Sequence, residues 1–183
     1  MTDPAQFAGE RRRAVGDRRA ASRSGPPTRE IEALNAVTLH HRALNAALHR
    51  HAKAVCEAGT GLQTSIEVHR STKGFLNFCR AEILPHTLAE EQFLYPLVPS
   101  DGRGALLVSA MRDEHRRIVD LITQVDVVRR PADAGAAAYG AALLFAAHAY
   151  KGDALLLPHI MTIPGVSLAD AVEGRLALIG YDG

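Results

Sequence analysis

Apolar residues recur at every third or fourth position through four long stretches of this chain, and no other feature constrains its fold as strongly. This spacing is the period of an amphipathic α-helix, whereas a half-buried β-strand alternates at every second position. The stretches run over about residues 31–59, 64–97, 105–130 and 133–157, with a shorter amphipathic piece at 167–179. Long amphipathic helices with short connections predict an all-α protein: an up-down-up-down antiparallel four-helix bundle with a short C-terminal helix.

An Arg-rich segment precedes the first of these stretches. Residues 10–29 carry seven Arg against two acidic residues, a net charge of +5, and few apolar side chains. Such a composition cannot form a packed core. We therefore expect a disordered arm over residues 1–29 and a folded domain over residues 30–183. The arm is either a solvated tail or, through residues 10–29, a contact for nucleic acid or an acidic partner.

Length and hydropathy limit the class of protein. The chain has 183 residues, of which 47% are hydrophobic, enough for one domain with its own core. No apolar run approaches the roughly 18 residues of a membrane-spanning helix, and no apolar segment follows a basic start. We expect a soluble, cytoplasmic protein that makes no membrane contact.

Histidines on the apolar faces are the first functional signal. Each predicted long helix carries one histidine inside its apolar stripe; these are His41, His86, His115 and His148. In an up-down bundle, two residues share a level when they lie equally far from the turn joining their helices. The midpoints of successive histidines fall at residues 63–64, 100–101 and 131–132, within or beside the expected turns. The four imidazoles are therefore predicted to lie in one layer.

A layer of buried imidazoles needs a chemical explanation. A single core histidine is ordinarily satisfied by one hydrogen bond, but several together repel one another if charged and lack partners if neutral. A metal ion supplies the partner, because neutral imidazole is a preferred ligand of iron, zinc, copper and nickel. Glu90 supports this interpretation, since it follows His86 by four residues and lies on the same helix face.

A second His-carboxylate pair repeats the first less regularly. The stretch HTLAEEQFLYP begins at His86, HAYKGDALLLP begins at His148, and both end in Pro. Asp153 lies five residues after His148, and an ideal α-helix turns it about 140° away. Asp153 joins the layer only if the helix widens locally into a π-turn, which Gly152 favours. Otherwise it is an exposed residue near a helix end.

Together these residues resemble the hemerythrin-like family, also called HHE cation-binding domains. The shared pattern is a His in the first helix, His-x3-Glu in the second, a His in the third and His-x4-Asp in the fourth. HTLAEEQFLYP is similar to the family's second-helix signature and DEHRRIVDLI to the start of its third helix, and the resemblance covers about residues 30–160. It implies two non-haem irons, with zinc or manganese as alternatives, bridged by carboxylates and an oxo or hydroxo group. The implied ligands are His41, His86, Glu90, His115, His148 and Asp153, and the implied partners are O2, peroxide or nitric oxide.

Two positions depart from that family's pattern. Oxygen-carrying hemerythrins have a second third-helix histidine where this chain has Val119, and bacterial relatives have Glu where it has Gly152. We expect Val119 to face the metals and to leave one iron short of a ligand, unless water or Glu82 replaces it. An open position favours reaction or sensing over reversible oxygen carriage.

Other interpretations stay open at this point. The site holds one metal ion or none, or the chain is a non-catalytic bundle that binds a partner through its Arg-rich arm. A ferritin-like diiron bundle is disfavoured, because its Glu-x-x-His pairs place Glu before His, whereas here His comes first.

Overall fold

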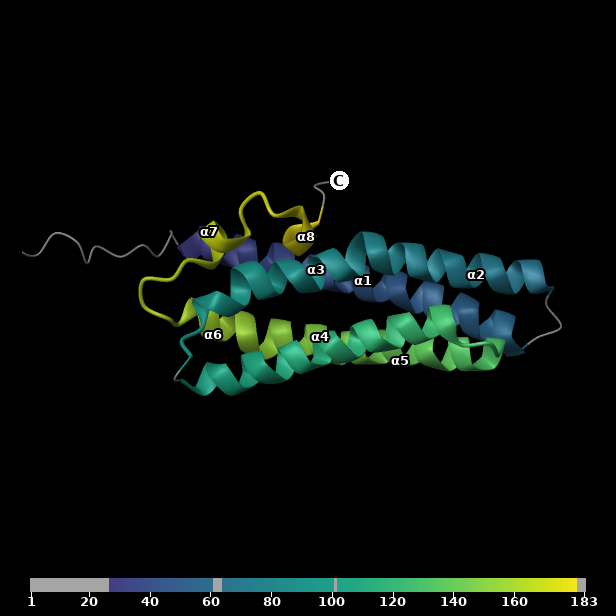
Figure 1. Cartoon of the computed structure of the whole chain (residues 1–183). Helices are drawn as coiled ribbons and strands as arrows, with labels where there is room; N and C mark the ends of the chain where they lie inside the picture. Colours follow the sequence, from purple (N-terminus) through teal and green to yellow (C-terminus); the bar gives the residue numbers. More distant parts are fainter. Residues whose placement is uncertain (1–26, 61–63, 101, 181–183) are drawn as a thin grey trace, which may run out of the picture.

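The computed structural model describes residues 27–60, 64–100 and 102–180 of the chain. Within these ranges every regular element is helical, which confirms the predicted all-α class. The longest elements are the α-helices α1 (Pro27–Thr60), α2 (Ser65–Phe78), α4 (Arg103–Val127) and α5 (Pro131–Lys151). They lie side by side along a common direction (Figure 1), and α5 packs against both α1 and α4.

Two of the long helices continue through short segments of different pitch. After α2 the chain stays helical through η1 (Cys79–Ile83), α3 (Leu84–Ala89), η2 (Glu90–Leu94) and η3 (Tyr95–Leu97). After α5 it stays helical through η4 (Gly152–Leu156) and α6 (Leu157–Met161). The segments η1, η2 and η4 are π-helical turns, and η3 is a 3-10 turn. The widened turn that Asp153 requires is therefore present at Gly152.

Proline explains where the π-turns occur. Pro85, Pro96 and Pro158 each stand two residues after the end of a π-turn. Proline has no N–H, and its ring clashes with the carbonyl four residues before it, so a regular α-helix is disturbed there. In each case the residue before the proline donates its N–H to the carbonyl five residues back. We predicted that the fourth helix ends near Leu157, but for this reason it continues past Pro158 to Met161.

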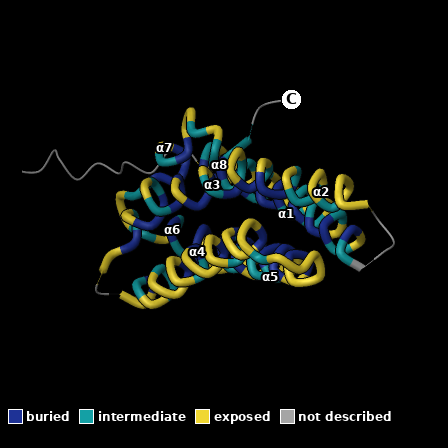
Figure 2. Tube along the Cα trace, turned by 45° about the vertical axis from the view of Figure 1, so that its right-hand side comes forward, coloured by how far each residue is buried: buried dark blue, intermediate teal, exposed yellow. Residues whose placement is uncertain are grey.

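The core consists of two apolar clusters with buried polar residues between them. One cluster includes Leu44, Leu48, Phe75, Ile118 and Phe145, and the other includes Val37, Met111, Leu156, Leu168 and Leu178. Along α1, His41 falls between Val37 and Leu44, and along α4, His115 falls between Met111 and Ile118. Figure 2 shows the buried residues on the inner sides of the helices and the exposed ones on the outer sides. The histidines thus have apolar packing on both sides.

The start of the folded region differs from the prediction. Helix α1 begins at Pro27, so residues 27–29 belong to a helix and not to the arm. Proline suits the first turn of a helix, where its missing N–H would have no partner in any case. Arg29 in this turn pairs with Asp170 and Glu173 at 2.6 and 2.9 Å. The rest of the predicted arm, residues 1–26, lies outside the described residues.

The C-terminal region also differs from the prediction. In place of one helix over 167–179 there are two short ones, α7 (Leu168–Val172) and α8 (Leu176–Ile179). Gly174 lies between them with a φ of 68°, a left-handed conformation that ends a helix and that glycine adopts without strain. Both short helices pack against α1, and α8 also contacts α3 (Figure 1).

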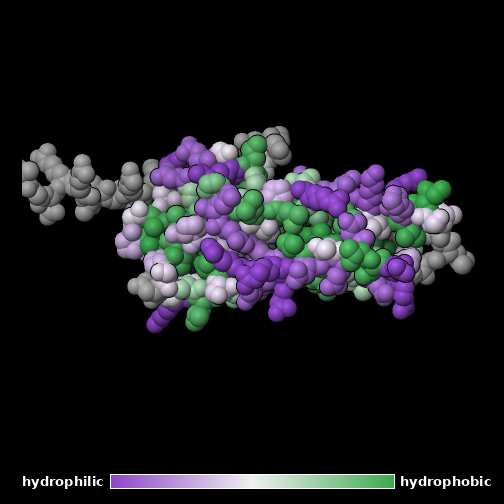
Figure 3. All heavy atoms as spheres, viewed as in Figure 1, coloured by the Kyte–Doolittle hydropathy of each residue, from purple (hydrophilic) through white to green (hydrophobic). Residues whose placement is uncertain are grey.

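Polar and apolar side chains are interspersed over the face of the molecule shown in Figure 3. Scattered exposed apolar residues of this kind are ordinary on protein surfaces. Among the residues that the structure describes, none of the helices has the length and apolar character needed to cross a membrane.

Candidate metal centre

Five of the six predicted ligands converge in the polar layer. His41 comes from α1, His86 from α3, Glu90 from the start of η2, His115 from α4 and His148 from α5. None of these side chains is more than 3% exposed. Because α3 and η2 are parts of one continuous helix, the five residues come from four helices, and only the packed fold brings them together. The predicted single layer of histidines is thus what the structure shows.

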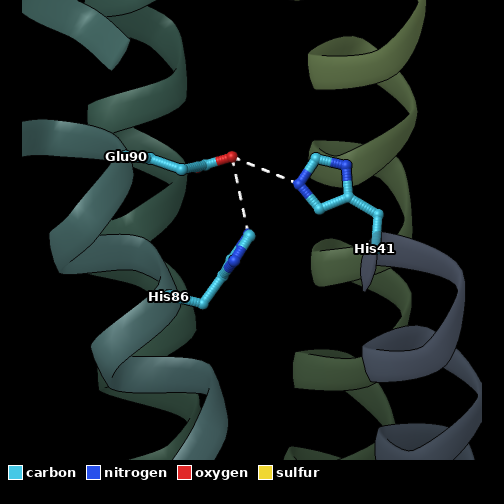
Figure 4. A group of neighbouring side chains, drawn as sticks. All are labelled: His41, His86 and Glu90. Carbon is cyan, nitrogen blue, oxygen red and sulfur yellow. Dashed lines mark ion pairs between the residues drawn. The ribbon is translucent and has the colours of Figure 1, made fainter. Parts of the chain in front are cut away.

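The carboxylate of Glu90 lies at the centre, with two imidazoles beside each oxygen. Oε1 lies 3.4 Å from His41 Nε2 and 3.5 Å from His86 Nε2, as Figure 4 shows. Oε2 lies 3.1 Å from His115 Nε2 and 2.9 Å from His148 Nε2. We call His41, His86 and Glu90 the Oε1 group, and Glu90, His115 and His148 the Oε2 group. In each group one donor atom per residue lies within 4.8 Å of the others, which is close enough for a shared metal ion.

In each of the four site histidines, the ring nitrogen that points away from Glu90 contacts an oxygen atom. Nδ1 of His41 contacts Asp153 Oδ1 at 2.6 Å, and Nδ1 of His86 contacts the Ala177 carbonyl at 2.8 Å. Nδ1 of His115 contacts Glu91 Oε1 at 2.8 Å, and Nδ1 of His148 contacts Glu114 Oε2 at 3.1 Å. A carbonyl or carboxylate oxygen accepts, so Nδ1 carries the proton. The Nε2 lone pair of the neutral ring then faces Glu90. Histidine ligands of metals are commonly oriented in this way by a hydrogen bond to the other nitrogen.

Asp153, the sixth predicted ligand, belongs to neither group. The π-turn η4 directs its carboxylate to the far nitrogen of His41, and Thr38 Oγ1 donates to the same oxygen at 3.2 Å. Its side chain is 25% exposed, unlike the five converging residues. In this arrangement Asp153 orients His41, and its role as a direct ligand stays a prediction.

The expectation that Val119 faces the metals is wrong. Val119 is 40% exposed, whereas Met111 is fully buried. The two residues lie four positions after and four before His115, about 40° to either side of it on the helix. The interior lies on the Met111 side, so a thioether and not a valine flanks His115 there. Glu82, considered as a substitute ligand, is in neither donor group.

Gly152 allows a close approach between η4 and His41. A Cβ atom at this position would lie 3.2 Å from His41 Cε1 and 3.9 Å from Met111 Cε. The absence of a side chain therefore lets the π-turn pack directly against the His41 ring. The same turn supplies Asp153, the partner of His41 Nδ1.

Tyr95 is a site residue that the sequence analysis missed. Its buried hydroxyl lies 3.2 Å from both Glu90 Oε2 and His115 Nε2. Tyr95 follows Glu90 by five residues, and the π-turn η2 brings it back to the same face. The signal was available, because Pro96 follows Tyr95 as Pro158 follows Leu157. Burial and the neighbouring Glu90 charge raise the pKa of Tyr95, so the hydroxyl stays protonated and donates a hydrogen bond to Glu90 Oε2.

The electrostatics favour an ionised Glu90. Burial alone would raise the pKa of this carboxyl, but His86, followed by His115, His148 and His41, outweighs burial and holds the pKa well below its usual range. Burial likewise opposes a charge on His41, but Asp153 and Glu90 outweigh it and raise the pKa of His41 to about 9. Without a metal, a proton on His41 thus occupies the place of a cation beside Glu90.

The donor set fits a metal ion on two observations. Nε2 of His41 and Nε2 of His86 are buried and make no hydrogen bond within the described part of the chain. Nε2 of His115 lies 3.0 Å from Nε2 of His148, so with Nδ1 as the donor in both rings two acceptor nitrogens face each other. Buried polar atoms without partners are costly. A cation in each group removes both problems.

Comparison with known families supports this interpretation. The model of the family described as Hemerythrin HHE cation binding domain matches residues 32–163, well over half of the chain. The chain belongs to the hemerythrin HHE cation-binding domain family. No curated protein and no solved structure matches it. All five converging residues lie within the HHE match, whereas α7 and α8 lie beyond its end.

Proposed function

We propose that this hemerythrin HHE domain is a non-haem diiron protein that binds or reacts with a small ligand: O2, peroxide or nitric oxide. The single observation that carries the proposal is the position of Glu90, whose two carboxylate oxygens each face the Nε2 atoms of two histidines. A carboxylate so placed would offer one oxygen to each of two metal ions. The HHE family membership supports the same conclusion.

Each donor group would hold one ion. His41, His86 and Glu90 Oε1 form one set, and His115, His148 and Glu90 Oε2 form the other. Imidazole and carboxylate donors suit iron, and they also accept zinc or manganese. When bound, iron supplies the redox chemistry and the affinity for small ligands, and the protein supplies the donors and controls access.

The chain's own residues define what can reach the site. Three protein donors per ion leave coordination positions free for an exogenous ligand. Met111 and Phe145 are fully buried beside the layer, and the ring of Phe145 lies 5.8 Å from that of His86. These apolar neighbours exclude bulk water and favour a ligand as small as O2, nitric oxide or peroxide. The Tyr95 hydroxyl holds a proton beside the Oε2 group, where it stabilises the Glu90 carboxylate.

The proposal includes an up-down-up-down bundle as the framework of the site. Its support is that the long helices lie side by side in Figure 1 and that the polar layer falls between the same two apolar clusters on α1 and α4. In such a bundle each helix contributes inward-facing ligands at one level.

The test is iron binding followed by ligand reactivity. The protein is purified, freed of metal, reloaded with ferrous iron without oxygen, and assayed for iron per chain. We expect two irons per chain, near-ultraviolet charge-transfer absorption after oxidation, and a spectral change when the ferrous protein meets nitric oxide or peroxide. Protein that binds no transition metal under these conditions contradicts the proposal. Metal binding without any response to the three ligands contradicts its functional part.

A further inference from the structure

One of the four histidine-orienting contacts comes from outside the family domain. Nδ1 of His86 donates to the carbonyl of Ala177 at 2.8 Å. Ala177 lies in α8, beyond the HHE match that ends at residue 163. The other three orienting groups are carboxylates of Glu91, Glu114 and Asp153, all within the match. His86 therefore depends on a segment that the HHE domain itself does not contain.

Helix α8 is built so that this carbonyl is available. The N–H groups of Leu178 and Gly180 donate to the carbonyls of Arg175 and Leu176, at 2.8 Å each. Carbonyls in the last turn of a helix have no partner within the helix. Ala177 is in that position, and its carbonyl accepts from the imidazole. Gly180 then ends the helix with a φ of 77°, and a Cβ there would lie 3.0 Å from His40 Nδ1.

Buried contacts hold the segment in place at its other end. The carboxylate of Glu30, which is only 8% exposed, accepts from Ser167 Oγ at 2.6 Å and from the Leu168 N–H at 2.8 Å. Leu168 in α7 and Leu178 in α8 are both fully buried. A surface tail would not bury a carboxylate and two leucines. The segment belongs to the second apolar cluster of the core, and α7 and α8 lie against α1 (Figure 1).

We propose that residues 164–180 act as a positioning segment for the Oε1 group, with the Ala177 carbonyl keeping the His86 proton on Nδ1 so that Nε2 is free to bind a metal. This inference rests on the proposed metal-binding function. It assigns the segment a selective effect, because the Oε2 group has its orienting carboxylates on the bundle helices themselves. Loss of docking by α8 weakens metal binding by the Oε1 group and leaves the Oε2 group unchanged.

The test compares two substitutions in the same short helix. Leu178→Asp places a charge in the core and displaces α8, whereas Leu176→Asp places the same charge on a side chain that is 44% exposed. Metal titration of each full-length variant gives the affinities of the two sites. We expect Leu178→Asp to weaken one site by about 10–100-fold, the range for lost partners of metal-bound histidines. Leu176→Asp should bind both metals as the parent protein does.

Combined variants identify which site has weakened. With Leu178→Asp present, adding His41→Ala should cost little further binding of the remaining metal, whereas adding His148→Ala should remove it. Weakening of both sites by the same factor would show general destabilisation and overturn the proposal. So would unchanged binding at both sites in a variant whose α8 has become sensitive to protease. If Leu178→Asp does not fold, Leu178→Ala is compared with Leu176→Ala in the same way.

A second measurement does not require metal. Nitrogen-15 NMR of the metal-free protein reports which ring nitrogen of His86 carries the proton. The parent and Leu176→Asp should show the proton on Nδ1, and Leu178→Asp should show a mixture or the other tautomer. An Nδ1 proton that persists after α8 is displaced overturns the positioning role. If the parent shows this tautomer but binds no metal, the proposed function fails while the positioning of His86 stands.

Discussion

The two donor groups share one carboxylate, yet their surroundings differ. In the Oε2 group, the imidazole nitrogens already contact each other and Glu90 at 2.9 to 3.1 Å, with Tyr95 beside them. In the Oε1 group, Nε2 of His41 and of His86 stand 3.4 and 3.5 Å from Glu90 without a hydrogen bond. The same ligand types thus lie closer to Glu90 in the Oε2 group than in the Oε1 group.

The orienting groups of the two donor groups also come from different parts of the fold. Glu91 and Glu114 lie on the bundle helices beside the histidines that they orient. His41 depends on Asp153 in a π-turn, and His86 depends on a carbonyl of α8. Both groups therefore use a π-turn, η2 for Glu91 and η4 for Asp153, but the Oε1 group also requires the C-terminal segment.

The shared carboxylate gives the largest expected effect. Glu90→Gln keeps the size of the side chain but removes the negative charge that both groups use. We expect both metals to be lost, with affinities reduced by more than about 100-fold, because neither group retains an anionic donor. Metal content after reloading measures this, with Glu57→Gln on the exposed part of α1 as the matched control. Retention of one tightly bound metal would show that Glu90 does not serve both groups.

Single histidine substitutions should separate the two groups. His41→Ala removes a donor only from the Oε1 group, and His148→Ala removes one only from the Oε2 group. We expect each variant to retain one metal per chain when calorimetric titration is combined with metal analysis. His69→Ala is the control, because His69 is exposed on α2 and belongs to neither group. Loss of both metals from either variant would contradict this independence and show that the two groups do not bind metal separately.

Orienting carboxylates should have smaller and group-specific effects. Asp153→Asn should weaken the Oε1 group, and Glu114→Gln should weaken the Oε2 group, each by about 10–100-fold. Metal titration of the paired variants compares the two directly. An effect of Asp153→Asn as large as that of His41→Ala would identify Asp153 as a direct ligand, as first predicted from the sequence.

Competition between protons and metal should give the smallest change in metal affinity, counted per pH unit. The pKa of His41 is raised to about 9 in the metal-free protein. Below that pH a metal entering the Oε1 group must displace the proton, so apparent affinity should rise by about tenfold per pH unit and level off above pH 9. Calorimetry in buffers of different ionisation enthalpy counts the released protons. A pH-independent affinity of the Oε1 group between pH 7 and 9 would contradict the protonated state of His41.

The helices and the histidine layer were predictable because both depend on local repeats. Helical phase places His41, His86, His115 and His148 on apolar faces without reference to any partner. Equal distances from the turns then place them at one level. Glu90 follows from the same phase, since it is one turn after His86.

Tyr95 and Val119 show where helical phase fails. Three prolines widen the helices into π-turns, and each turn shifts the following residues by one position relative to an α-helix. That shift returns Tyr95 to the site, and recognising the role of Pro96 would have predicted it. The prediction for Val119 failed for another reason. Met111 and Val119 lie at equal angles on either side of His115, and only the neighbouring helices decide which of the two is buried.

The sequence by itself determined an all-helical chain with four histidines and Glu90 in one buried layer, because these properties follow from the period of a single helix. Only the tertiary structure decided how the layer divides into two groups and which atoms orient each histidine. The Ala177 carbonyl is the clearest case. Every residue carries a backbone carbonyl, so its position in space, and not its residue type, makes it the partner of His86.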